Sequence, residues 1–180
     1  EPLSIGAHAL RRAQLEAKDT LVVMGCGPIG VGIIQLAKNA GFRIIALDID
    51  LKRLQFVEKI VNGIDTVLAD DQAVDKIMKL TQGTLADAVF DATGNKRAME
   101  RGHHFMKHGG KYILVGLYKD LLSFKHPEIH AKETSLLCSR NATKEDFDWV
   151  IQTLKKDAFP VKHYITHQLH FDTLIESFES

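Results

Sequence analysis

The fold of this chain is decided by Leu21-Val22-Val23-Met24-Gly25-Cys26-Gly27-Pro28-Ile29-Gly30. Its first four residues form an apolar run that is typical of a parallel strand buried on both faces. Glycines follow at the G-x-G-x-x-G spacing, and a helical pattern runs from Pro28 to Ala40. A second apolar strand, residues 43–47, ends at Asp48. This order of strand, glycine turn, helix, strand and acid predicts a βαβ unit in a parallel sheet.

Each residue type in this unit suits a bound dinucleotide. Gly25 permits a tight turn, Gly27 lets the backbone approach a pyrophosphate, and Gly30 lets the helix pack closely on the strand. The helix N-terminus offers free N–H groups and a positive dipole end to the phosphates. Asp48, about 20 residues beyond the turn, can accept hydrogen bonds from both hydroxyls of an adenosine ribose. An S-adenosylmethionine site uses a similar turn and acid, so a methyltransferase is an alternative, as is a nucleotide-free domain.

Composition narrows the class of protein. The 180 residues suit one domain, and zero formal net charge with a pI near 7.3 argues against a nucleic-acid or anionic membrane partner. No apolar run is long enough to span a membrane, and Cys26 and Cys138 are too few for a disulfide framework. We therefore expect a cytoplasmic protein, in which the Asn141-Ala142-Thr143 glycosylation sequon is accidental. Because the chain begins at Glu1 without Met, we expect it to be part of a longer protein.

The rest of the chain alternates between helical and strand patterns. Helices are expected at residues 5–17, 51–61, 73–80, 96–106, 144–154 and 171–178, and strands at 66–68, 87–91, 111–117 and 135–139. This alternation predicts an α/β fold with a doubly wound parallel sheet (Rossmann), about six strands with helices on both faces. We interpret residues 1–180 as one dinucleotide-binding domain whose closing strand lies outside the chain.

Several motifs in register extend the pattern beyond the glycine turn. They are Glu1-Pro2-Leu3-Ser4-Ile5-Gly6, Leu47-Asp48, Asp91-Ala92-Thr93-Gly94, Gly109-Gly110-Lys111 and Leu114-Val115-Gly116-Leu117. Together they resemble the zinc-dependent medium-chain alcohol dehydrogenases, and above all the branch that acts on sorbitol and other polyols, threonine and sugar acids. The resemblance covers nearly the whole chain, but only the coenzyme domain of that family.

The resemblance implies NAD as the cofactor. It implies cofactor contacts from Gly25, Gly27, Pro28, Ile29, Gly30, Asp48, Arg53, Thr93, Val115, Gly116, Leu117, Ser139 and Arg140. Ile29 would pack beside the pyrophosphate, Arg53 would lie along the ribose, and residues 115–117 would meet the nicotinamide. Asp48 would repel the extra phosphate of NADP, an effect that Lys52 and Arg53 can partly offset.

The resemblance also implies a catalytic zinc in the full-length enzyme, with ligands upstream of Glu1 and outside this chain. Glu1 would lie near the zinc-bound water, and Arg140 could reach substrate, whereas Asn141 stands where sorbitol enzymes carry an aromatic residue. We expect no metal in this chain and interpret Cys26 and Cys138 as packing residues. His126 and His130 could share a helix face. The other clustered histidines, His103-His104-His108 and His163-His167-His170, are expected to be solvated or packing residues.

These expectations combine into one function with alternatives. The full protein would transfer hydride between NAD and a small-molecule secondary alcohol (a polyol, sugar acid or hydroxy-amino acid), while this chain alone would bind NAD weakly and be inactive. A stand-alone nucleotide-sensing module, which is not an enzyme, is an alternative function. We also expect a homodimer or homotetramer formed through the edge strand near Ser135–Ser139.

Overall fold

The computed structural model describes residues 1–165 and 167–174. Within them, the chain forms one sheet of six parallel strands, in the order β3-β2-β1-β4-β5-β6. The strands are β1 (Thr20–Met24), β2 (Arg43–Asp48), β3 (Asp65–Leu68), β4 (Ala86–Asp91), β5 (Met106–Leu114) and β6 (Ser135–Cys138). The order reverses direction between β1 and β4, so the predicted doubly wound sheet is confirmed.

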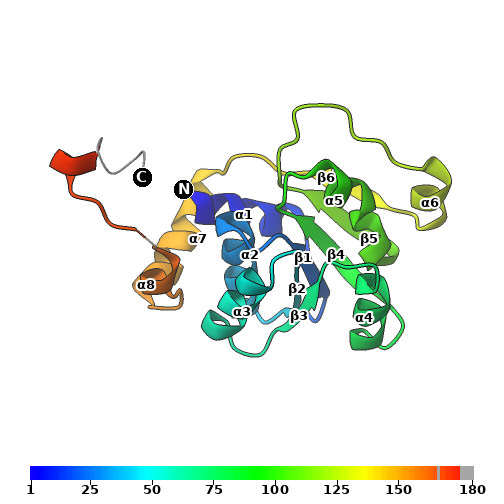
Figure 1. The fold of residues 1–180 in the computed structure, drawn as a ribbon, viewed down its shortest axis with the longest axis horizontal. Helices are drawn as coiled ribbons and strands as arrows, with labels where there is room; N and C mark the ends of the chain where they lie inside the picture. Colours follow the sequence, from blue (N-terminus) through cyan, green and yellow to red (C-terminus); the bar gives the residue numbers. More distant parts are fainter. Residues whose placement is uncertain (166, 175–180) are drawn as a thin grey trace.

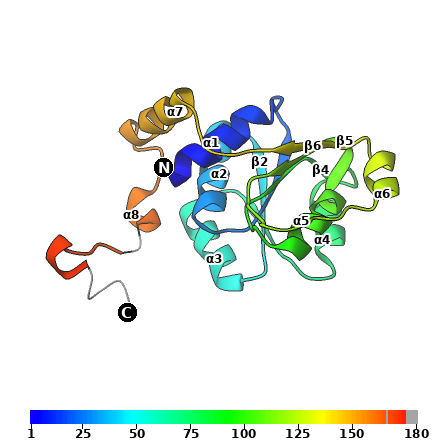
Figure 2. The ribbon, with the colours of Figure 1, turned by 90° about the horizontal axis from the view of Figure 1, so that it is seen from above.

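Helices cover both faces of this sheet (Figures 1 and 2). They are α1 (Pro2–Arg12), α2 (Pro28–Asn39), α3 (Leu51–Ile60), α4 (Ala73–Leu80), α5 (Lys96–Arg101), α6 (His126–Ala131), α7 (Lys144–Lys155) and α8 (Val161–Tyr164), with 3-10 turns η1 (Gly102–Phe105) and η2 (Phe171–Thr173). One core layer joins the sheet to α1, α2, α3 and α7, and the other joins it to α4, α5 and η1. In the described part of the chain, no helix is both long and apolar enough to cross a bilayer.

The strand β1 shows why the sheet is buried on both sides. Leu21 and Val23 pack into the layer under α2, whereas Val22 and Met24 pack into the layer above α4. All four side chains are buried because successive strand residues point to opposite faces and both faces carry helices. The continuous apolar run in the sequence has this cause.

The first helix is shorter than the sequence predicts. It ends at Arg12 and not at Ala17, because Gln14 adopts a positive φ of 47° that breaks the helical path. The ammonium group of Lys111, on β5, donates hydrogen bonds to the carbonyl oxygens of Ala13 (2.9 Å) and Gln14 (2.6 Å). These contacts satisfy carbonyls that a helix end leaves free.

The predicted helix 96–106 extends too far, and the predicted strand 111–117 begins too late. The helix α5 stops at Arg101, η1 follows, and β5 already begins at Met106, which pairs with Ala86. A register shift between Ala86 and Ala88 accommodates the extra residues, so the glycines at 109 and 110 lie inside the strand. At its other end β5 stops at Leu114, and residues 115–117 form a loop.

The C-terminal part contains α7, close to its predicted range, and a helix, α8, that the sequence pattern did not indicate. The described part of the predicted helix 171–178 contains the 3-10 turn η2, and residues 175–178 lie outside the described range. Ser139, predicted as the last residue of its strand, follows β6. The Tyr164 hydroxyl donates a hydrogen bond to the carbonyl oxygen of Pro28 (2.9 Å) and so joins α8 to the start of α2.

A buried acid joins the first and last large helices. Asp146 on α7 accepts hydrogen bonds from Nε of Arg11 on α1 (2.8 Å) and from the Thr143 N–H (2.7 Å), and its Oδ2 lies 2.8 Å from Nδ1 of His8. Burial alone would raise the pKa of Asp146, but the bonds from Arg11, Thr143 and His8 outweigh it and hold that pKa well below its usual range. This clamp, formed by His8, Arg11 and Asp146, fixes α7 on α1.

Candidate cofactor-binding site

A cavity of about 580 Å³ opens at the carboxyl ends of β1, β2 and β4. It lies where the strand order reverses, which is the place at which open α/β sheets bind ligands. Gly25 and Gly27 line it from the turn after β1, Asp48 from the end of β2, and Thr93 from the loop after β4. The topology therefore brings together residues that are far apart in the sequence.

The glycine turn has the geometry that its spacing predicts. Gly25 adopts a φ of 91°, which side chains disfavour, and a Cβ on Gly30 would fall on the carbonyl oxygen of Gly25. At Gly27 a Cβ would meet nothing within 4 Å, so the bare backbone faces open space. Among the described residues, no side chain caps the N-terminus of α2, which begins at Pro28 behind this turn. Free amides and an empty approach are what a diphosphate needs.

Asp48 is held in place from two sides. Its Oδ2 accepts a hydrogen bond from the Cys26 backbone N–H (2.6 Å), and its Oδ1 accepts one from the Asp50 N–H (2.9 Å). Nη1 of Arg53, a half-exposed cation at the cavity, lies 3.9 Å from Oδ2. The carboxylate is buried yet lines the cavity, so each oxygen keeps acceptor capacity toward a ligand.

A second buried acid, Asp91, shapes the loop after β4. Its Oδ1 accepts hydrogen bonds from the backbone N–H groups of Thr93 (3.0 Å) and Gly94 (3.3 Å), and its carbonyl oxygen accepts from Val115 (2.9 Å) and Gly116 (2.8 Å). Burial raises the pKa of Asp91, while the bonds from Thr93 and Gly94 counteract that shift. Asp91 thereby holds two loops together at the carboxyl end of the sheet.

The site residues expected from the sequence fall into two groups. Gly25, Gly27, Asp48, Arg53 and Thr93 line the cavity together. The residues that do not line it are Glu1, Pro28, Ile29, Gly30, Val115, Gly116, Leu117, Ser139 and Arg140. The structure thus assembles the half of the expected site that would hold pyrophosphate and ribose.

The remaining expected residues have identifiable surroundings. Pro28, Ile29 and Gly30 form the first turn of α2 directly behind the glycine turn. The loop 115–117 packs on Gly94, where an added Cβ would approach the carbonyl oxygen of Leu117 to 3.1 Å. Ser139 is buried, and its hydroxyl has no hydrogen-bond partner among the described residues. The remaining two, Glu1 and Arg140, are exposed on the surface.

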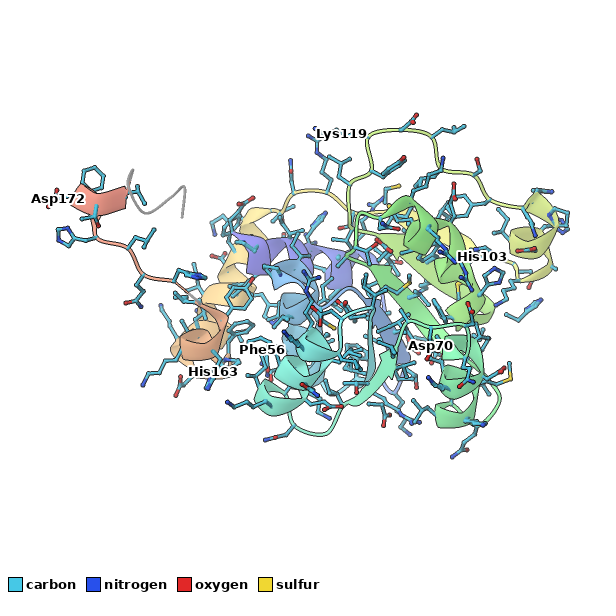
Figure 3. All side chains as sticks on the ribbon, in the orientation of Figure 1. Phe56, Asp70, His103, Lys119, His163 and Asp172 are labelled. Carbon is cyan, nitrogen blue, oxygen red and sulfur yellow. The ribbon has the colours of Figure 1, made fainter. Side chains whose placement is uncertain are left out.

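Polar residues that were not expected from the sequence also line the cavity. Arg97 and Arg101 lie one turn apart on α5, and Asp70 and Asp71 follow the end of β3. Asp70, labelled in Figure 3, forms an ion pair with Lys76 (2.7 Å) that lowers its pKa. The rule that singled out Asp48, an acid at the carboxyl end of a strand, would also have indicated Asp70.

The two cysteines behave differently. Cys26 is buried in the core, as predicted, and burial raises the pKa of its thiol to about 12. The prediction that Cys138 is a packing residue is wrong, because β6 is the edge strand and leaves that side chain exposed. Of the histidines, His126 and His130 do share a helix, α6, with ring centroids 5.3 Å apart.

Comparisons with known proteins agree with this geometry. Residues 28–156 match the model of a protein family described as zinc-binding dehydrogenase. The chain belongs to the zinc-binding dehydrogenase family. One relative of this chain is the L-galactonate-5-dehydrogenase of Escherichia coli (strain K12), 38% identical over 182 residues, which are 99% of this chain and 53% of that protein.

Two further similarities extend the comparison. The erythritol/L-threitol dehydrogenase of Mycolicibacterium smegmatis is 34% identical over 172 residues, covering 93% of this chain and 47% of that protein. The crystal structure of 2R,3R-butanediol dehydrogenase from Bacillus subtilis superposes with a TM-score of 0.85 at 26% identity, covering 98% of this chain and 50% of that one. The chain spans about half the length of the curated relatives it matches.

Proposed function

We propose that this chain is the NAD-binding domain of a zinc-type dehydrogenase that transfers hydride between NAD and a secondary alcohol, namely a polyol, sugar acid or hydroxy-amino acid. The observation that carries the proposal is the pairing of a bare glycine turn with the Asp48 carboxylate on one cavity at the strand reversal. The relatives named above are dehydrogenases of sugar acids and polyols, which supports this substrate class.

The residues of the cavity fit a dinucleotide. Gly27 and the uncapped start of α2 would hold the pyrophosphate, because free amides and the helix dipole both favour anions there. Asp48 would accept hydrogen bonds from the adenosine ribose, and Arg53 would lie beside it. Gly25, Pro28, Ile29, Gly30 and Thr93 would support this half of the site.

The other half of the proposed site lies at the ends of β5 and β6. Val115, Gly116, Leu117, Ser139 and Arg140 would border the nicotinamide, and the buried Ser139 hydroxyl, which has no hydrogen-bond partner among the described residues, would be a polar group at that place. When bound, NAD supplies the hydride acceptor, and this chain binds and orients it. Arg140 and Glu1 are proposed to face substrate and the zinc-bound water in the longer protein.

We propose NAD and not NADP as the preferred cofactor. Asp48 would stand against the extra 2′-phosphate, and two anions brought together with little intervening water repel strongly. Arg53 and Lys52 are exposed cations that reduce this repulsion without removing it.

The zinc of the full enzyme is proposed to lie outside this chain. In the part of the chain that the structure describes, the residues lining the cavity include acids and arginines but neither His nor Cys, the ligands that a catalytic zinc site draws on. They therefore do not fit a zinc ion. The chain alone is expected to bind NAD weakly and to be inactive, as a coenzyme domain without its catalytic partner.

The proposal is tested by titrating the chain with NADH, NADPH and S-adenosylmethionine. NADH should bind, and Asp48→Ala should weaken it about ten-fold or more, which corresponds to the 1.5–3 kcal/mol of a charged hydrogen bond. Asp65→Ala is the matched control, since Asp65 pairs with Arg43 on the surface, away from the residues lining the cavity. Binding of S-adenosylmethionine in place of NADH would instead support a methyltransferase.

The longer protein is proposed to be a cytoplasmic homodimer or homotetramer. The strand β6 lies at the edge of the sheet, as predicted for Ser135–Ser139, and its outer side could pair with the same strand of a second copy. The cytoplasmic location rests on the two free cysteines.

A stand-alone nucleotide sensor would bind NADH equally well, and the sequence of the longer protein would distinguish it through the presence or absence of a zinc-bearing domain.

A further inference from the structure

Two imidazoles and one carboxylate meet between η1 and α6, outside the residues that line the cofactor cavity. Nε2 of His103 lies 3.2 Å from Oε2 of Glu128, and Nε2 of His104 lies 3.6 Å from the same oxygen. One potential ligand atom from each of these three residues lies within 4.8 Å of the others. Figure 3 labels His103 on the side of the domain that carries α6.

His103 and Glu128 are within hydrogen-bonding distance, and the same separations also suit a metal coordination polyhedron. Two ligand atoms bound to zinc at about 2.0–2.1 Å, with tetrahedral angles, lie roughly 3.3 Å from each other. The two separations from Oε2 bracket that value, so little movement is needed to place an ion between the three groups.

We propose that His103, His104 and Glu128 form a binding site for a divalent transition-metal ion, with zinc the best match. Two imidazoles with one carboxylate suit zinc better than Mg²⁺ or Ca²⁺, which take oxygen ligands. Three protein ligands leave a fourth position for water. The site would be distinct from the zinc expected upstream of Glu1, because all three of its ligands belong to this chain.

The ligand side chains are packed together inside the protein. His103 is 2% exposed, its ring contacts that of His104 at a centroid distance of 4.1 Å, and its Nδ1 has no partner among the described residues. Both imidazoles therefore lie side by side next to the Glu128 carboxylate.

One lysine competes for the free oxygen of Glu128, and another holds the backbone of the two histidines in position. Nζ of Lys125 lies 3.1 Å from the other carboxylate oxygen of Glu128, Oε1. Nζ of Lys132 donates hydrogen bonds to the carbonyl oxygens of His103 (3.0 Å), His104 (3.3 Å) and Met106 (2.7 Å). The backbone that carries both histidines is therefore fixed before an ion arrives, as in a preorganised metal site.

An ion at this place would fasten α6 to η1. The helix α6 directly follows residues 115–125, a segment that begins with the proposed nicotinamide contacts. Zinc should therefore raise the midpoint of thermal unfolding, because it binds groups that come together only in the folded chain. This proposal departs from the expectation that the chain holds no metal.

The test is a calorimetric zinc titration of the metal-stripped 180-residue chain. One zinc ion should bind per chain, and His104→Gln and Glu128→Gln should each weaken it by at least the roughly ten-fold that loss of an outer-shell partner already causes. Lys125→Gln should tighten binding, because it removes a cation that competes for Glu128 from an exposed position. Opposite effects from neighbouring substitutions would not arise from general destabilisation.

Two further variants distinguish this site from adventitious binding. His108→Gln is the matched control, since Nδ1 of His108 lies 3.6 Å from Glu133 Oε2 with both side chains exposed, and it should bind zinc as the wild type does. Loss of zinc binding in the double variant His126→Gln with His130→Gln, but not in Glu128→Gln, would overturn the proposal. So would a wild-type chain without zinc binding.

One measurement on the wild type keeps the test valid if a variant fails to fold. The imidazole ¹⁵N resonances of His103 and His104 should shift when one equivalent of zinc is added, while that of His108 should not. Unchanged His103 and His104 resonances would overturn the proposal whatever the variants do.

Discussion

The backbone N–H of Cys26 donates a hydrogen bond of 2.6 Å to Oδ2 of Asp48, so this bond joins the glycine turn directly to the end of β2. The acid proposed to read the ribose is thus also a support of the turn proposed to hold the pyrophosphate. A substitution at Asp48 should affect cofactor choice and stability together, and the two effects can be measured separately.

Asp48→Asn tests the charge without changing the shape of the side chain. We expect the ratio of NADH to NADPH affinity to fall by about ten-fold or more, because the repulsion of the 2′-phosphate disappears. Fluorescence titrations with both cofactors measure this ratio. Unfolding in urea should also show a loss of about 1–2 kcal/mol, since a charged acceptor for Cys26 becomes neutral. An unchanged ratio would contradict the role given to Asp48.

The glycine turn offers a matched pair of substitutions. Gly30→Ala should destabilise the fold by more than the roughly 1–3 kcal/mol of ordinary overpacking, because the new Cβ meets the backbone oxygen of Gly25. Gly27→Ala should unfold at the wild-type temperature, since its Cβ meets open space, yet weaken NADH binding because the methyl group enters the cavity. Thermal unfolding and NADH titration of both variants check this. Full NADH affinity in Gly27→Ala would place the diphosphate elsewhere.

The clamp formed by His8, Arg11 and Asp146 should make stability depend on pH. The pKa of Asp146 is lower in the folded chain than in the unfolded one, where it is about 3.9. Its stabilisation is therefore fully present above about pH 4 and is lost as the pH falls through the folded-state value. Asp146→Asn should cost about 1–3 kcal/mol at pH 7, because Arg11 and His8 lose a charged partner.

Urea unfolding at pH 7, 5, 4 and 3 measures this dependence. The difference between wild type and Asp146→Asn should stay constant down to about pH 5 and shrink below about pH 4. Asp148→Asn is the control, because Asp148 forms an exposed pair with Lys144 and should change stability by no more than a few tenths of a kcal/mol. A difference that grows on acidification would refute the assignment.

The proposed dimer makes β6 the place to disrupt. Leu136, an exposed apolar residue on this edge strand, should become a barrier to strand pairing when it is changed to Lys. Light scattering after size exclusion should show a dimer for the wild type and a monomer for Leu136→Lys. Leu121→Lys adds the same charge at an exposed position in the loop before α6 and should remain dimeric. A monomeric wild type would rule out this interface for the chain.

Much of the fold follows from local sequence. The apolar runs and the glycine turn predict the order of strands and helices, because a strand buried on both faces cannot be polar and a tight turn needs a residue such as Gly25. The failures lie where distant contacts decide. Met106 is in a strand because it pairs with Ala86, and α1 stops early at a place where Lys111 meets its last carbonyls.

The same distinction applies to the sites. Asp48 is visible in the sequence because a spacing rule ties it to the glycines. His103 and Glu128 are 25 residues apart, with β5 between them, so no spacing rule connects them. Only the return of the chain from β5 to α6 brings them together.

The contact of α1 with α7 has a consequence for how such a unit is used. Because α1 precedes the sheet, α7 follows it and the two helices pack together, the segments on either side of the sheet lie side by side (Figure 1). A domain whose flanking segments lie close together can be inserted into a loop of another domain with little disturbance of that domain. Insertion of this unit into other proteins, in evolution or by design, is therefore structurally feasible.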